Sequence, residues 1–120
     1  MAEIRVEAVE FPDARPVDGY GPGFTRVGGT VFRGPILILP SGVSAWGGYD
    51  DHAPLLAAAP DLDVLFVGTG AEMLPLPADF RAAMEAAGVP IEPMATPPAC
   101  RTFNVLLSED RRVGLALIPV

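Results

Sequence analysis

Two runs of four consecutive apolar residues, Ile36–Leu39 and Val64–Val67, restrict the fold of this 120-residue sequence more than any other feature. Each run has the length of a β-strand and lies between residues that favour turns, such as proline, glycine and aspartate. Neither run alternates apolar with polar residues, as a strand with one face in water does. Both strands are therefore expected in a central sheet with both faces covered, which indicates an α/β fold.

Three helices are expected to cover this sheet, each beginning at a side chain that can accept a hydrogen bond from the first turn. The second has apolar residues at the spacing of one helical face and stops at Gly88. The expected helices are one through Ala59 capped by Asp50 or Asp51, one with Phe80, Ala83, Met84 and Ala87 capped by Asp79, and one capped by Thr96 with Pro97 in first position.

Shorter strand patterns complete the expected sheet structure. Phe24–Val27 and Thr30–Phe32 flank Gly28-Gly29 as the two arms of an antiparallel hairpin. Residues 12–23 and 41–49 are expected to form loops. Further expected strands are the alternating first ten residues with Ile4, Val6 and Ala8 on one face, Ile91–Met94, and Arg112–Ile118. The sequence thus predicts a single α/β domain over residues 1–120, with three layers and a mixed, mostly parallel central sheet plus an amino-terminal antiparallel hairpin.

Charge and cysteine content exclude several classes of partner and scaffold. The net charge is −7, and all eight basic residues are arginines. A surface this acidic repels phosphate backbones and anionic lipid headgroups, so neither nucleic acid nor a membrane is the expected partner. The one cysteine cannot form an intrachain disulfide. The first residues are acidic where a signal peptide needs basic ones, so a cytoplasmic location is expected.

The turn Gly68-Thr69-Gly70, directly after the second apolar run, is the first candidate binding site. A glycine-rich turn at the carboxyl end of a sheet strand lets backbone amides approach a ligand. The dinucleotide-binding pattern is incomplete, because Met73 stands where the third glycine is needed. The alternative is a tight strand-to-loop turn that needs a positive φ.

Cys100, with Arg101 beside it, is the second candidate. If Thr96 caps the third helix, Cys100 lies in the first turn, where the helix dipole favours a thiolate. Cys100 also falls on the apolar face of that helix with Phe103, and a free cysteine there is usually a small core residue. A reactive thiol and a core residue both remain open.

Trp46 and Tyr49 form the third candidate, either as an exposed anchor for a partner or as a lid over the core. Ser41 and Ser44 lack the flanking pattern of a catalytic serine. His52, the one histidine, is expected to be solvated or to act as a cap. A metal site needs several converging ligands, so neither a metal nor a cofactor is expected.

Several segments of the chain together resemble the small bacterial and archaeal domain family related to the mitochondrial complex I (NADH:ubiquinone oxidoreductase) assembly factor 3. The resemblance covers residues 15–120. The segments that carry it are Leu65-Phe66-Val67-Gly68-Thr69-Gly70, Met94-Ala95-Thr96, Ala99-Cys100-Arg101-Thr102-Phe103-Asn104, Arg112-Val113, Leu117-Ile118-Pro119, Gly21-x-Gly23-Phe24 and Trp46.

This resemblance implies a three-layer α/β fold and a role in binding. The mitochondrial relatives help to assemble the membrane-peripheral arm of complex I by contacting another assembly factor and structural subunits. The family pattern gives added weight to a shared feature made by Gly68, Gly70, Cys100, Arg101 and Asn104.

Two hypotheses of function follow. The first is a non-enzymatic protein that binds another protein, as an assembly or biogenesis factor for a respiratory or membrane complex. The alternative is a small-molecule-binding protein or an enzyme that uses the Gly68–Gly70 turn with Cys100 and Arg101. The oligomeric state is open in both.

Overall fold

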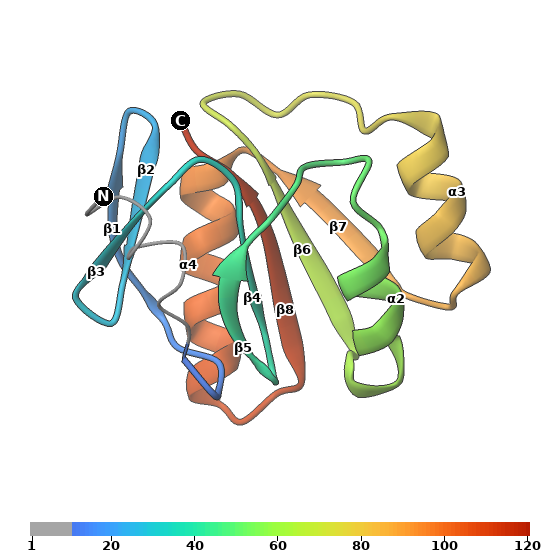
Figure 1. Ribbon diagram of the computed structural model, residues 1–120, viewed down its shortest axis with the longest axis horizontal. Helices are drawn as coiled ribbons and strands as arrows, with labels where there is room; N and C mark the ends of the chain where they lie inside the picture. Colours follow the sequence, from blue (N-terminus) through green and yellow to red (C-terminus); the bar gives the residue numbers. More distant parts are fainter. Residues whose placement is uncertain (1–10) are drawn as a thin grey trace.

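The computed structural model describes residues 11–120, so the strand expected over the first ten residues lies outside the described residues. Strands and helices alternate from residue 42 onward. In chain order the elements are β1 (Val17–Gly21), β2 (Phe24–Val27), β3 (Thr30–Arg33), β4 (Ile36–Leu39), β5 (Gly42–Ala45), α2 (Ala53–Ala58), the 3-10 helix η1 (Ala59–Asp61), β6 (Val64–Thr69), α3 (Ala78–Ala86), β7 (Ile91–Met94), α4 (Thr96–Ser108) and β8 (Val113–Ile118) (Figure 1).

Five strands form a central sheet in the order β5-β4-β8-β6-β7. β8 lies in the middle, antiparallel to β4 and parallel to β6. The β5–β4 pair is antiparallel and the β6–β7 pair is parallel, so two of the four pairings are parallel. The mixed central sheet is confirmed, and both apolar runs occupy interior strands.

Each face of the central sheet is covered, which gives the three layers expected. Successive residues of β4 point to opposite faces, so Ile36 and Ile38 join one core cluster while Leu37 and Leu39 join the other. The first cluster includes buried residues of α4 and of β1–β3, and the second includes buried residues of α2 and α3. Helices and a small sheet therefore enclose the central sheet (Figure 1).

The small sheet contains the expected hairpin and one strand that sequence patterns miss. β2 and β3 pair as the expected hairpin around Gly28-Gly29, and both glycines have positive φ, 57° and 81°. β1 pairs with β2, although residues 12–23 are expected as a loop. Asn104 holds β1 against α4, since its Oδ1 accepts the Val17 N–H at 2.9 Å and its Nδ2 donates to the Val17 oxygen at 3.0 Å.

Replacing Asn104 with alanine should lower the free energy of unfolding by about 1–2 kcal/mol, because both backbone groups of Val17 lose their partner in a partly buried position. Denaturant unfolding measures this change. Val105→Ala is the control, since Val105 lies on the same helix with half of its side chain exposed. Equal stability of the two variants would show that Asn104 does not fasten β1.

The first helix does not begin at the expected cap. Gly42–Ala45, within the expected loop 41–49, forms the edge strand β5. The N-cap residue of α2 is His52, and no side chain caps this helix. The carboxylate of Asp51 instead accepts the Gly47 N–H at 3.0 Å, so the prediction that Asp50 or Asp51 caps α2 is wrong.

The other two helices also start differently from the expectation. α3 has Pro77 as its N-cap residue, and Asp79 lies in its first turn without capping it. α4 has Ala95 as its N-cap residue, so Thr96 is the first helical residue and not the cap. The Thr96 hydroxyl is bound instead to groups of β8 and of the turn after β6.

Candidate functional site

The turn after β6 is bound to the start of α4. Gly68 and Thr69 end the strand, and Gly70 follows with a φ of 107°, a conformation that favours glycine. The Gly70 N–H donates to Thr96 Oγ1 at 2.8 Å, and the Gly70 oxygen accepts the Thr96 N–H at 2.8 Å. A side chain at position 68 would place its Cβ 2.8 Å from Thr96 Oγ1. The glycines therefore allow β6 and α4 to approach each other closely.

Thr96 is the residue of this region whose role the sequence does not reveal. It is fully buried, and its hydroxyl donates to the Ile118 oxygen at 2.6 Å while accepting the Gly70 N–H. One side chain thereby ties the ends of β6 and β8 to the first turn of α4. The signal that could have pointed to it is its place in Met94-Ala95-Thr96, one of the segments that carry the family resemblance.

The hydroxyl of Thr69 organises the loop that leaves β6. It accepts the Leu74 N–H at 3.0 Å and lies within donating distance of two carbonyl oxygens, those of Glu72 at 2.6 Å and Met94 at 3.1 Å. A hydroxyl has one hydrogen to donate, so the shorter contact to Glu72 takes most of it. Thr69 itself is buried, and its side chain serves the loop backbone.

Cys100 is a core residue on α4. Only 3% of its surface is exposed, and it packs in the same core cluster as Ala99 and Phe103. Because α4 begins at Thr96, Cys100 lies in the second turn. Burial raises the pKa of the thiol from its ordinary value of 9.0 to about 11, and the charge of Arg101 offsets part of this increase. The thiol is therefore protonated at neutral pH and shielded from solvent.

This pKa predicts an alkaline dependence of stability. The unfolded state releases the thiol proton above about pH 9 while the folded state keeps it up to about pH 11, so the unfolded state binds fewer protons in this window. The free energy of unfolding should therefore fall as the pH rises from about 9 to about 11. Denaturant titrations of the native protein and of Cys100→Ala should show this decline in the native protein alone. Parallel pH profiles would contradict it.

Arg101 and Asn104 project from α4 into different surroundings. Arg101 is exposed and lines a shallow depression of about 260 Å³ with Thr102, Val105 and Leu106. Asn104 is half-buried, and its side-chain amide is bound to Val17.

Trp46 lies on the other face of the central sheet from Cys100. It is 5% exposed, belongs to the core cluster under α2 and α3, and donates from Nε1 to the Asp51 oxygen at 3.0 Å. The centre of its ring lies 6.0 Å from that of Phe80 and 5.6 Å from that of Tyr49, and both contacts are edge-on. Trp46 and Tyr49 therefore form a lid over this core. His52 packs against the same Phe80 ring at 5.9 Å.

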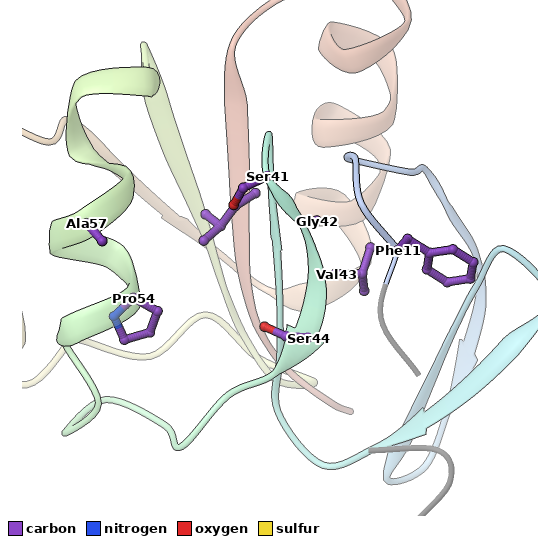
Figure 2. Close-up of a pocket in the computed structure, with 8 residues that line it drawn as sticks. Phe11, Ser41, Gly42, Val43, Ser44, Pro54 and Ala57 are labelled. Atoms are coloured by element: carbon purple, nitrogen blue, oxygen red, sulfur yellow. The ribbon is translucent and has the colours of Figure 1, made fainter. Parts of the chain in front are cut away.

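The two serines considered as nucleophiles line a separate pocket of about 340 Å³ between β5 and α2. Figure 2 shows the Ser41 and Ser44 hydroxyl groups and the facing residues of α2. The lining contains no histidine, arginine or carboxylate that could activate a hydroxyl. It consists of Phe11, Leu39, Ser41, Gly42, Val43, Ser44, Pro54 and Ala57.

Charged groups are dispersed over the described chain. Among residues 11–120 no three or more His, Cys, Asp or Glu side chains converge to hold a metal ion. Arg112 donates to Asp63 Oδ1 at 2.9 Å, and this hydrogen bond lowers the pKa of the exposed carboxyl group. In the same range of residues, no helix has the length and apolar character that crossing a membrane requires.

Comparison with known proteins finds relatives in bacteria and animals. An uncharacterised protein of Rhodobacter capsulatus is 50% identical over 110 residues, which cover 92% of this chain and 89% of that protein. The NADH dehydrogenase [ubiquinone] 1 alpha subcomplex assembly factor 3 of Mus musculus is 38% identical over 118 residues. That match covers 92% of this chain and 63% of the mouse protein, so this chain spans less than two-thirds of the assembly factor.

Solved structures show the same architecture. The crystal structure of a Bartonella henselae protein, described as an outer membrane protein, has a TM-score of 0.84 and 37% identity. The alignment covers 92% of this chain and 98% of that one. Residues 17–118 match the family described as "Protein of unknown function (DUF498/DUF598)". The chain therefore belongs to this family and is related to the complex I assembly factor 3, which confirms the resemblance seen in its sequence.

Proposed function

We propose that this chain is a protein-binding assembly factor for a respiratory or membrane complex. The observation that carries the proposal is the 38% identity with the mouse assembly factor, extending over 92% of this chain. Such a factor needs a stable surface that recognises a subunit, and it needs no catalytic group of its own.

The geometry at the end of β6 supports binding over chemistry. The Gly70 amide and carbonyl, which could have met a small ligand, are both bound to Thr96. The Cys100 thiol is buried and protonated, and the Asn104 amide is bound to Val17. The turn and the thiol that the alternative function would use are thus engaged inside the fold or protonated in its core, while Arg101 is exposed on α4.

The test is affinity capture from the native host, with cross-linking before lysis. A tagged copy of the chain should recover subunits of NADH dehydrogenase or of another membrane complex, identified by mass spectrometry. Recovery of no stable protein partner would contradict the proposal. A thermal-shift screen over nucleotides and anionic metabolites addresses the alternative, because a ligand that binds the folded state raises the melting temperature.

The proposal also implies that the chain lies in the cytoplasm, because the membrane-peripheral part of such a complex is accessible from there. The net charge of −7 favours a protein partner over nucleic acid or lipid headgroups. Fractionation of cells that contain or lack the assembled complex tests this location by showing which fraction contains the chain.

A further inference from the structure

The loop from β6 to α3 displays two adjacent apolar side chains to solvent. Met73 is 54% exposed and Leu74 is 51% exposed, and every residue from 71 to 75 is exposed. This loop runs along the top edge of the molecule in Figure 1. Among residues 11–120 the other large apolar side chains with this degree of exposure stand singly on separate elements, namely Tyr20, Leu56 and Val105. An adjacent exposed pair of this kind marks a contact surface more strongly than scattered residues do.

This loop is held in place at both ends. At its start the buried Thr69 hydroxyl binds the backbone of Glu72 and Leu74, on either side of Met73. At its end Leu76 is buried in the core cluster that contains Phe80, and the prolines at 75 and 77 restrict the backbone. The conformation that exposes Met73 and Leu74 therefore needs little further ordering on binding, which favours affinity.

The charges around the loop indicate the chemistry of its partner. Glu72 precedes Met73, Asp79 lies in the first turn of α3, and residues 70–89 carry these two carboxylates and Glu85 against one basic residue, Arg81. A second copy of this chain, also carrying −7, and an anionic membrane surface are both repelled by this segment. A protein groove with an apolar floor and a basic rim is attracted to it.

We propose that Met73 and Leu74 insert into an apolar groove, rimmed by lysine or arginine, on the protein that this chain helps to assemble. The inference rests on the proposed function and names the surface that performs it. The Gly68–Gly70 turn and Thr96 then form the rigid base from which the loop is presented.

Site-specific photo-cross-linking in the native host locates the contact. With p-benzoylphenylalanine at position 73 of the full chain, the cross-link should form to a subunit of a respiratory or membrane complex, at an apolar site bordered by basic residues. The matched control carries the same group at Val105, which is also 54% exposed but lies on α4. Cross-linking of the same subunit from position 105 and not from 73 would overturn the proposal.

Affinity capture with variants supplies the quantitative test. Met73→Ser/Leu74→Ser should reduce recovery of that subunit at least about tenfold, as for truncation of hot-spot residues, while Val105→Ser retains it. Glu72→Lys should weaken capture, most strongly at low salt. Because Met73 and Leu74 are half-exposed, their replacement should leave the melting temperature unchanged. An unchanged melting temperature then shows that each variant is folded.

The other outcomes separate this proposal from the proposed function. If the native chain captures the subunit and the double serine variant captures it equally, the loop is not the surface and the proposed function stands. If the native chain captures no such subunit, both fall. Loop-dependent dimerisation in sedimentation experiments, or loop-dependent binding to phosphatidylglycerol vesicles, would overturn the proposal in favour of a second copy or a membrane.

Discussion

Replacing Thr96 with valine is expected to lower the free energy of unfolding by about 2–5 kcal/mol, although the two side chains have nearly the same shape. The substitution leaves the buried Gly70 N–H without its acceptor and the partly buried Ile118 oxygen without its donor. Each unsatisfied buried group costs about 1–3 kcal/mol. Urea unfolding followed by circular dichroism measures the loss.

Thr25 provides a matched control on β2. It is also fully buried, but its hydroxyl has no hydrogen-bond partner among residues 11–120. Thr25→Val should therefore leave stability unchanged or increase it, because valine removes an unsatisfied polar atom and suits a strand. Similar losses in the two variants would show that the Thr96 hydrogen bonds contribute nothing specific.

Replacing Gly68 with alanine should lower the free energy of unfolding by about 2–3 kcal/mol, near the upper end of the cost of overpacking. The added Cβ would lie 2.8 Å from Thr96 Oγ1 and 3.2 Å from Thr96 Cα. The hydroxyl cannot move away without losing its bonds to Gly70 and Ile118. The loss is measured by the same urea titrations.

Two comparisons isolate this steric effect. Gly88→Ala, at a φ of 76° with open space around the new Cβ, should cost only the backbone strain of about 1–2 kcal/mol. Gly68→Ala should be less costly in a Thr96→Ala background, because the nearest colliding atom is absent. Strictly additive losses at positions 68 and 96 would contradict the close approach described for the two residues.

The sequence predicts the apolar strands well because their signal is local. Ile36–Leu39 and Val64–Val67 are apolar throughout, and both become interior strands of the central sheet. β1 and β5 are harder to predict, because the glycines, proline and serines around them are typical of loops. β1 is held by the side chain of Asn104, 87 residues away, and such a contact leaves no mark on the local pattern.

The predictions of the helix caps are wrong for a related reason. Asp51 and Thr96 have the right side chains to cap a helix, but other backbone groups bind their oxygen atoms. Asp51 accepts the N–H of the nearby Gly47, and Thr96 binds Gly70 and Ile118, which are far away in the sequence. At the candidate site, helical spacing places Cys100 on the apolar face of α4, where it is buried. No local pattern shows that the Gly68–Gly70 turn is bound to Thr96, or that Met73 and Leu74 are the side chains left in solvent.

The position of β8 in the middle of the sheet has a consequence for synthesis of the protein. β4 and β6 are translated well before residues 113–118, yet neither has its interior neighbour until those residues leave the ribosome. The nascent chain therefore exposes the edges of two strands with apolar runs, Ile36–Leu39 and Val64–Val67, for as long as the ribosome takes to translate the intervening α3, β7 and α4. Chaperone dependence should accordingly be concentrated in that interval, and in a chain stalled before residue 113 the strands β4 and β6 should be protease-sensitive once they have left the ribosome.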